Sequence, residues 1–376
     1  MSGPAGLTVL HLVSNRWWTG SAEPAIRIVS ALRGRGHRTL LALIPGDRFE
    51  QKAREAGIDP VAGLSLEGGF RPFGLVRDLL RLRWLVRSEA IDVIHCHHSH
   101  DHWLGSLGGR SVALVRTFHN ARAVRPSWPS TALYRRTDAA IAVSAEIEER
   151  CRRAGLPDDR VHRVDGVVEI ARFDAQHDGA AVRKEFGVGA GPVLGSVARL
   201  AANRGHELLV RGFRLLLPRH PGARLLLVGK GEARPRLEAF VRELGLTEQV
   251  LFTGYRDADL PEVLRALDVF VLMGAGSDES CRAALEAMAA GRPVVARRVG
   301  ALPDTVMHGV TGLLVEGEEP EAVAAALERL LEDPALARRM GQAGRRRVEE
   351  AFSPERHAER VEAVYRAALG RRGREE

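Results

Sequence analysis

Short apolar runs alternate along the chain with longer stretches in which apolar residues recur every three to four positions. The stretches at 25–37 and 206–220 have the spacing of amphipathic helices that bury one face. The apolar runs predict buried strands at 7–13, 38–44, 91–96, 113–119, 139–144, 160–164, 192–198, 223–229, 250–254, 268–274 and 292–296. Strands that alternate with helices in this way imply parallel sheets with helices on both faces. Because ligands of such sheets bind beyond the carboxyl ends of the strands, we expect functional residues just after each strand.

A boundary between two domains is expected near residues 175–191, where the sequence is polar and rich in glycine and alanine before a new strand begins. The length of 376 residues also favours two domains of ordinary size. We expect an N-terminal domain at 1–178, a C-terminal domain at 190–354, and a C-terminal helix and tail at 355–376. The predicted fold class is α/β, with two doubly wound, Rossmann-like domains facing each other across a cleft. Whether the last helix crosses back to the N-terminal domain is open.

The composition fits a globular protein with an anionic partner. Hydrophobic residues make up 45% of the chain, charged residues make up 27%, and the formal net charge is +7. This charge suits nucleotide phosphates, nucleic acid or a membrane surface, and the total does not separate the three. The three cysteines, Cys96, Cys151 and Cys281, are widely spaced, which favours a reducing compartment. The first residues predict a strand and not a signal peptide, and no apolar run approaches the ~20 residues of a transmembrane helix. We therefore expect a cytoplasmic protein, with peripheral contact at the inner face of the cytoplasmic membrane as an option.

The segment SDESCRAALEAMAAGRPVV at 277–295 places two acidic residues, Asp278 and Glu286, around the start of an expected helix. The segment follows a predicted strand, so a loop should come first and the helix should begin near Cys281. Free backbone N–H groups at such a helix start form a site suited to a phosphate. Glu286 and Asp278 could then accept hydrogen bonds from hydroxylated rings on either side of a diphosphate. The alternative is that Asp278 caps the helix and Glu286 is solvated.

The same segment resembles the acidic signature of the retaining GT-B glycosyltransferases of family GT4, E-G-F-G-x-x-x-x-E-A-M-A-x-G-x-P-V-V. The matching residues are Glu286, Ala287, Met288, Ala289, Gly291, Pro293, Val294 and Val295. The chain departs from the signature at its front, where Asp278 replaces the first Glu and residues 279–282 replace a glycine-rich turn. The resemblance extends over nearly the whole chain, since the segments at 197–213 and 299–315 are similar to two other family segments.

The resemblance implies a donor site in the C-terminal domain. Arg199 and Arg204 match the cations that neutralise the donor diphosphate, whose charge grows as the sugar–phosphate bond breaks. The helix start at Ser280, Cys281 and Arg282 would share this role. The alternative for the two arginines is that they are ordinary surface residues.

Other residues of the same domain would bind the nucleotide and the sugar. Glu286 would contact the ribose and Asp278 the hydroxyls of the transferred sugar. The turn containing Gly229, and Gly254 with Tyr255 and Arg256, would frame the nucleotide, largely through backbone groups. A third glycine, as in dinucleotide-binding turns, is absent because Arg234 stands in its place, so NAD is not expected.

The N-terminal domain carries two further segments with a family resemblance. The sequence WWTGSAEPAI at 17–26 is similar to a G-G-x-E loop, in which Gly20 would let the backbone approach the donor phosphate closely. The sequence RTFHN at 116–120 is similar to a T-x-H-G element, which makes His119 the candidate catalytic histidine. Asp278 is the other candidate catalytic residue. The alternative for His119 is a histidine at a strand end with a structural hydrogen bond.

Two further patterns are typical of metal sites, but no metal is expected at either. The histidine-rich sequence HCHHSHDH at 95–102 runs along a strand and its exit loop, where alternate residues should point in opposite directions. The sequence DAD at 257–259 precedes a helix, and Asp259 is better interpreted as the N-cap residue ahead of Pro261.

One segment, at 69–92, is apolar and rich in arginine and could help to bind the acceptor. It predicts either a packed helix with a solvated basic face or a surface helix that lies on anionic lipid headgroups.

We interpret the chain as a hexosyltransferase that moves a sugar from a nucleotide diphosphate sugar to an acceptor hydroxyl. The resemblance implies retention of configuration, no metal or other cofactor, and no nucleic acid partner. It also implies a glycan or lipid-linked acceptor, as in the synthesis of lipopolysaccharide or other cell-envelope glycans. Two alternatives stay open: a GT-B sugar-nucleotide epimerase or hydrolase, and a non-catalytic protein that binds nucleotide sugars.

Overall fold

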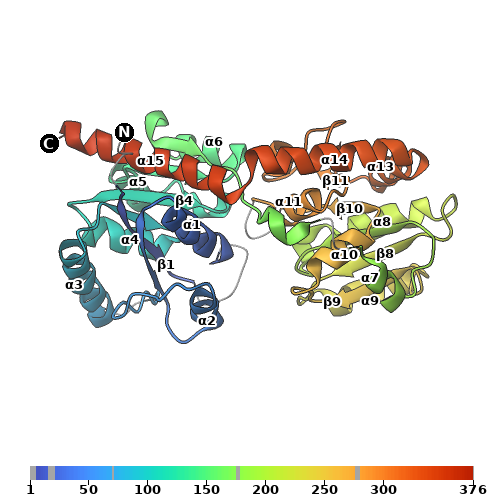
Figure 1. The fold of residues 1–376 in the computed structure, drawn as a ribbon, viewed down its shortest axis with the longest axis horizontal. Coiled ribbons are helices and arrows are strands. Elements are labelled where there is room, and N and C mark those ends of the chain that lie inside the picture. The colour runs from blue at the N-terminus through green and yellow to red at the C-terminus, as the bar shows by residue number, and fades with distance from the viewer. Residues whose placement is uncertain (1–5, 16–21, 70–71, 175–177, 276–279, 376) are drawn as a thin grey trace. The chain divides into compact units, whose positions relative to one another are not determined.

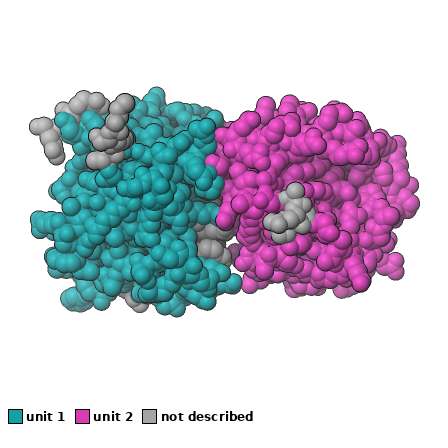
Figure 2. Space-filling view, viewed as in Figure 1, with its two compact units in different colours: residues 1–165, 277–279, 354–376 teal, residues 166–276, 280–353 magenta. Residues whose placement is uncertain are grey.

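The computed structural model describes residues 6–15, 22–69, 72–174, 178–275 and 280–375. Gly20 and Asp278, two of the predicted site residues, lie outside these ranges. The chain divides into two compact units (Figure 2). The first comprises residues 1–165 and 354–376, and the second comprises residues 166–276 and 280–353.

The first unit is built on a parallel sheet of six strands in the order β2-β1-β3-β4-β5-β6. The strands are β1 (Thr8–Val13), β2 (Arg38–Leu43), β3 (Val93–Cys96), β4 (Ala113–Phe118), β5 (Ala139–Ala142) and β6 (Val161–Arg163). The helices between them are α1 (Ala22–Gly34), α2 (Arg48–Glu55), α3 (Pro72–Ser88), α4 (Ser99–Gly108), α5 (Trp128–Arg135) and α6 (Ala145–Arg153) (Figure 1). The strand order changes direction between β1 and β3, which in open parallel sheets is the usual place for a ligand.

The second unit repeats this plan with the order β12-β11-β10-β7-β8-β9. Its strands are β7 (Val193–Val197), β8 (Arg224–Val228), β9 (Val250–Gly254), β10 (Val269–Leu272), β11 (Val294–Arg297) and β12 (Gly312–Val315). Its helices are α7 (Ala180–Glu185), α8 (His206–Leu216), α9 (Arg234–Glu243), α10 (Leu260–Ala266), α11 (Arg282–Ala289), α12 (Leu302–Thr305), α13 (Pro320–Glu332) and α14 (Pro334–Ala351) (Figure 1). Here the order changes direction between β7 and β10.

The eleven predicted strands are confirmed, and each sheet is parallel as expected. Successive residues of a strand point to opposite faces, and in the second sheet Leu225 and Leu227 join one apolar cluster while Leu226 and Val228 join another. Burial on both faces explains why these strands are continuous apolar runs. Strand β12 was not among the predicted strands.

The last helix, α15 (Pro354–Glu375), belongs to the first unit (Figure 1). Its residues Ala358, Val361, Tyr365 and Ala368 follow helical spacing and join the core around β1, β4 and β5. The crossing back that the sequence left open is therefore observed.

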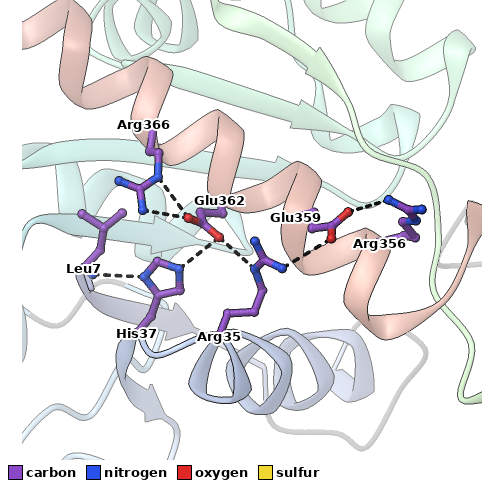
Figure 3. Close-up of polar contacts among 7 residues, drawn as sticks. All are labelled: Leu7, Arg35, His37, Arg356, Glu359, Glu362 and Arg366. Carbon is purple, nitrogen blue, oxygen red and sulfur yellow. Dashed lines mark hydrogen bonds and ion pairs between the residues drawn. The ribbon is translucent and has the colours of Figure 1, made fainter. Parts of the chain in front are cut away.

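A polar cluster also holds α15 against the first unit, and Figure 3 shows that Glu362 lies at its centre. The Glu362 carboxylate accepts hydrogen bonds from Arg366 on its own helix at 2.7 Å and from Arg35 at 2.8 Å. Nε2 of His37 lies 3.3 Å from the same carboxylate, and Nδ1 of His37 accepts a hydrogen bond from the Leu7 N–H at 3.0 Å. Burial alone would raise the pKa of Glu362, but these donors lower it to about 2.

None of the described helices has the length and apolar character that crossing a bilayer requires.

Candidate functional site

The predicted donor-site residues of the second unit gather at the carboxyl ends of four neighbouring strands. Arg199 and Arg204 follow β7, Gly229 follows β8, Tyr255 and Arg256 follow β9, and Ser280, Cys281 and Arg282 follow β10. These strands stand in the order β10-β7-β8-β9, so the change of direction falls between the first two of these loops. The sequence pattern and the observed topology therefore agree on the edge of the sheet where a ligand would bind.

Backbone contacts hold these loops close together. The Gly229 N–H donates to the Gly254 carbonyl at 2.8 Å, and the Leu200 N–H donates to the Lys230 carbonyl at 3.1 Å. Gly229 has a φ of +148°, and a Cβ atom at this position would lie 2.0 Å from the Ala198 carbonyl oxygen. Only glycine fits there, because the loops after β7 and β8 touch through their backbones.

Arg204 lies at the end of a 3₁₀ turn (Ala202–Arg204) beside the loop that follows β10. A Cβ atom on Gly274 would lie 2.9 Å from the Cα atom of Arg204, so these two loops are in backbone contact. The structure therefore brings Arg204 to the point where the strand order changes direction.

Arg199 and Arg256 differ in how firmly their side chains are held. Arg199 is exposed and pairs with the equally exposed Glu232 at 2.9 Å. Such a surface ion pair contributes little stability, so a phosphate could replace it. Arg256 is largely buried and makes a bidentate contact with Glu185 at 2.6 and 2.7 Å, which raises the pKa of Arg256. Arg256 also pairs with Asp259. Its side chain thus has a structural role, while Tyr255 beside it is half exposed.

Helix α11 begins one residue later than predicted, and the residue before it is in an unusual conformation. Cys281 occupies the N-cap position with a φ of +52°, a backbone conformation that residues other than glycine rarely adopt. Such strained residues concentrate at functional sites. Within the helix, the Glu286 carboxylate is buried and lies 3.1 Å from Nε of Arg282. Glu286 is therefore not solvated, which removes the simpler alternative for this residue.

His119 follows β4 in the first unit and is buried. Its Nε2 atom lies 3.2 Å from Nδ1 of His97, and Nε2 of His97 lies 3.2 Å from Nδ1 of His11. These three imidazoles connect the ends of β1, β3 and β4, at the place where the strand order changes direction. Burial, and then the positive charge of Arg116, lowers the pKa of His119 to about 3, so the ring is neutral at ordinary pH.

Asp101 fixes the backbone around this histidine chain. Its carboxylate accepts from the N–H groups of His98 at 2.7 Å, Ser14 at 3.2 Å and His97 at 3.3 Å, and it lies 3.9 Å from the buried guanidinium of Arg116. Burial raises the pKa of Asp101 to about 6, against the opposing effects of Arg116 and the backbone donors. Asp101, Arg116 and His11 were not among the predicted site residues. A partial signal was present, because the polar residues His11, His95 and Arg116 interrupt otherwise apolar strands.

The histidine-rich segment is arranged differently from the prediction. Residues His95 and His97 are two positions apart, so both point to one face, and their rings stack with centroids 4.3 Å apart. With His11 they bring one nitrogen each within 4.8 Å of one another, a spacing that could hold a metal ion. The expectation that these side chains diverge is wrong for this pair, although His102 does turn away to Thr137.

The donor set at this cluster nevertheless suits a metal poorly. Nδ1 of His95 lies 2.7 Å from the Tyr365 hydroxyl, and Nε2 of the same ring lies 2.7 Å from the Thr117 hydroxyl. Both nitrogens of His95 are thus engaged, and binding a metal would break a buried hydrogen bond.

The aspartates of the DAD sequence are also engaged. Asp257 pairs with Arg172 at 3.0 Å and Asp259 pairs with Arg256. Asp259 does occupy the N-cap position of α10, but its side chain makes no capping hydrogen bond. Asp259 is therefore at the predicted N-cap position, but the hydrogen bond that an N-cap side chain usually accepts is not formed.

Comparison with known proteins identifies the family. The model of the family described as glycosyl transferases group 1 matches residues 181–347, and that of glycosyltransferase family 4 matches residues 19–172. The chain belongs to glycosyltransferase family 4. It is 35% identical over 286 residues to the GDP-mannose-dependent alpha-(1-6)-phosphatidylinositol monomannoside mannosyltransferase of Mycolicibacterium smegmatis, covering 74% of this chain and 69% of that protein. It is 28% identical over 355 residues to the alpha-D-kanosaminyltransferase of Streptomyces kanamyceticus, covering 84% and 91%.

Solved structures agree on the fold. The Anabaena protein HepE in complex with UDP and glucose superposes with a TM-score of 0.80 at 20% identity, covering 95% of this chain and 99% of that one. A glycosyltransferase from Rickettsia africae has a TM-score of 0.85 at 18% identity, covering 97% and 99%. The protein is thus a glycosyltransferase of the two-domain GT-B fold, and the predicted fold class and enzyme class are confirmed.

Proposed function

We propose that this glycosyltransferase binds the diphosphate of its nucleotide sugar at the carboxyl ends of β7 and β10 and transfers the sugar with retention, without a metal. The observation that carries the proposal is the contact between the turn at Arg204 and Gly274 at the change in strand order. This contact brings the backbone of Arg204 beside the loop that follows β10. Guanidinium groups and a helix N-terminus both stabilise a diphosphate as it becomes a leaving group.

Each of the other candidate residues has a role in this proposal. Arg199 would exchange Glu232 for a phosphate, and Glu286 would accept from the ribose hydroxyls. Gly229 and Gly254 would bring backbone groups to the nucleotide, with Tyr255 beside them. Asp278 and Gly20 keep the roles that the family resemblance implies. His119 would donate or accept a hydrogen bond at the transferred sugar as a neutral imidazole.

The acceptor is proposed to be a glycan or lipid at an anionic membrane, with the first unit making peripheral contact. This is supported by α3, where Phe73, Val76, Leu80 and Trp84 follow helical spacing and are all exposed, Phe73 to 91%. Arg77, Arg83 and Arg87 on the same helix are also exposed. Apolar residues flanked by arginines suit the boundary between headgroups and acyl chains. The mannosyltransferase relative, by its name, acts on a phosphatidylinositol mannoside.

Vesicle flotation tests the membrane part of the proposal. The protein should float with vesicles containing phosphatidylglycerol and not with pure phosphatidylcholine vesicles. The double variant Phe73→Ser/Trp84→Ser should stay at the bottom of the gradient. Leu215→Ser, which removes an exposed apolar residue from α8 in the second unit, is the matched control and should float like the unchanged protein.

A nucleotide-release screen tests the catalytic part. UDP-, GDP- and ADP-sugars are each incubated with the enzyme, with and without sugar or lipid-linked acceptors. Release that depends on an acceptor supports transfer, and NMR of the product gives the anomeric configuration. Release without any acceptor, or formation of an isomeric nucleotide sugar, would favour the hydrolase or epimerase alternative. Binding without turnover of any donor would favour the non-catalytic alternative.

A further inference from the structure

A second concave site lies in the second unit, at the amino ends of the strands whose carboxyl ends lead into the donor loops. It is a cavity of about 930 Å³, and its lining includes Pro192, Asp268 and Pro293, the residues that directly precede β7, β10 and β11. The donor loops follow the other ends of these same strands. At about 3.3 Å per residue, a strand the length of β7 separates the two sites by roughly 13–17 Å. The cavity is therefore distinct from the proposed donor site.

The lining of this cavity is strongly basic. It contains five arginines and two aspartates: Arg265, Arg292, Arg338, Arg345, Arg346, Asp174 and Asp268. Three of the arginines come from α14, where 338, 345 and 346 lie on one face of the helix together with Gln342.

Both aspartates already have partners. Asp174 pairs with Arg345 at 3.1 Å. Asp268 pairs at 2.8 Å with Arg183, which is not part of the lining, and it also accepts from the Val193 N–H at 2.8 Å. Neither carboxylate forms an ion pair with the other four arginines among the described residues, although Asp174 and Asp268 partly offset the positive charge of Arg265 and Arg292.

Those four arginines keep donors for a ligand. Arg292 donates to the carbonyls of Leu267 at 2.8 Å and Ala290 at 3.4 Å, and it forms no ion pair with any described residue. The Nε atom of Arg265 is buried and has no hydrogen-bond partner within the described ranges. Within the same ranges, Arg338 and Arg346 make no ion pair or side-chain hydrogen bond.

The crowding of these cations has an electrostatic cost. Burial, followed by repulsion from Arg345, lowers the pKa of Arg265. Burial, followed by repulsion from Arg265, lowers the pKa of Arg292. Guanidinium groups stay charged under such conditions, so an anion that enters the cavity would relieve this repulsion.

We infer that this cavity is a binding site for a small phosphate-bearing anion, separate from the donor site. Guanidinium groups bind phosphate oxygens through bidentate hydrogen bonds, and four of them that form no ion pair among the described residues suit a ligand with more than one anionic group. The volume is within the range of sites that enclose small molecules.

Inorganic pyrophosphate is the probe, titrated calorimetrically into the full-length protein. The titrations use the Arg204→Ala background, so that binding at the proposed donor site is weakened. The test variant adds Arg338→Gln and Arg346→Gln, whose side chains have no structural partner to lose. The control instead adds Arg329→Gln and Arg339→Gln, two exposed arginines on α13 and α14 outside the lining, with the same change in net charge.

We expect pyrophosphate to bind to the Arg204→Ala protein and to the control variant, and to bind at least tenfold more weakly to the test variant. No binding in the Arg204→Ala background, or equal affinity in the test and control variants, would overturn it. Failure of the donor-site proposal has a different signature, since Arg204→Ala would then leave donor binding unchanged. Repeating the titration with glucose 1-phosphate and with uridine monophosphate distinguishes a sugar phosphate from a nucleotide as the source of the anion.

Discussion

Nδ1 of His97 lies 3.2 Å from Nε2 of His119, and this contact determines how the candidate catalytic histidine presents its proton. The chain continues from Nε2 of His97 to Nδ1 of His11. A neutral imidazole has one N–H donor and one acceptor nitrogen, so the proton positions of the three rings are linked. Nε2 of His11 and Nδ1 of His119, the outer nitrogens of the chain, are both buried. The chain can therefore run in either direction. Either His11 donates to His97 and His97 to His119, which puts the proton of His119 on Nδ1, or both donations are reversed, which puts it on Nε2.

The first prediction concerns His97. His97→Leu removes the hydrogen-bond partner of Nε2 of His119 and should lower kcat about tenfold, because a buried hydrogen bond contributes roughly 1–1.5 kcal/mol. His97→Asn places an amide group, which can donate or accept, near the former Nδ1 position and should recover much of this loss. Nitrogen-15 NMR of labelled histidines should report a single tautomer of His119 in the unchanged protein and a mixture of tautomers in His97→Leu. If a folded His97→Leu protein keeps its full turnover and its His119 tautomer, the histidine chain does not orient His119.

The second prediction follows from the lowered pKa of His119. With a pKa of about 3, the ring is neutral at every pH above about 4 and should not titrate in the range where the enzyme works. His119→Asn should lower kcat/KM by the same factor at every pH between 5 and 9. A ratio between the two proteins that changes sharply near pH 6–7 would show that His119 is charged in its working state, and the proposed neutral role would be wrong.

The sequence predicted most of the fold because buried parallel strands carry a strong local signal. Runs such as 7–13 and 223–229 are apolar on both faces, and glycine or polar residues end them. Strand β12, Gly312–Val315, was missed because it begins with a glycine, a residue depleted in strands, which leaves an apolar run of only three residues. The donor loops after β7 to β10 were predicted because ligands of open parallel sheets bind beyond the carboxyl ends of the strands. That prediction requires only the position at which each strand ends.

Side-chain partners were not predictable in the same way, because they depend on contacts between distant parts of the chain. His11 and His97 are 86 positions apart, and nothing local to either residue indicates the other. The buried pairing of Glu286 with Arg282 is local, yet the sequence alone allowed a solvated Glu286 equally well. The arginines of the second cavity come from α10, α14 and the turn before β11, so their gathering appears only in the folded unit.

The third prediction separates Glu286 from Asp278. If Glu286 binds the ribose, Glu286→Gln should weaken binding of both the intact donor and the free nucleoside diphosphate by roughly tenfold, because a hydrogen bond to a charged group contributes about 1.5–3 kcal/mol. Asp278→Asn should leave binding of the free nucleoside diphosphate nearly unchanged and lower turnover sharply, because the sugar is absent from that ligand. Calorimetry with the nucleotide and turnover of the donor measure the two effects. Equal loss of nucleotide affinity in both variants would mean that Asp278 holds the loop and does not contact the sugar.

The fourth prediction concerns metals. Arginines near the proposed diphosphate site supply positive charge, and the aspartates of the DAD sequence are paired with arginines, so activity should survive excess EDTA. Metal analysis of the purified protein should find less than a tenth of an equivalent of zinc. Loss of activity in EDTA with rescue by Zn²⁺ would point to His11, His95 and His97, whereas rescue by Mn²⁺ would point to the DAD sequence. Tyr365→Phe is a useful companion, because it removes the hydroxyl at Nδ1 of His95 and frees that nitrogen for a metal.

The last prediction tests how α15 is held to the first unit. The pKa of Glu362 is about 2 in the folded protein against an ordinary value of 4.5, so the stabilising effect of this carboxylate is complete above about pH 4.5 and is lost as the pH falls through 2. A shift of this size corresponds to a contribution to the free energy of unfolding on the order of 3 kcal/mol. Thermal unfolding of Glu362→Gln should therefore begin several degrees below that of the unchanged protein at pH 7, and the two midpoints should converge near pH 2. Glu359→Gln is the matched control, because Glu359 lies on the same helix and contacts the same Arg35 at 3.5 Å but is far more exposed. An exposed pair contributes little, so this variant should stay close to the unchanged protein at every pH. A midpoint difference for Glu362→Gln that persists unchanged down to pH 2 would mean that packing of the side chain, and not its charge, fastens α15.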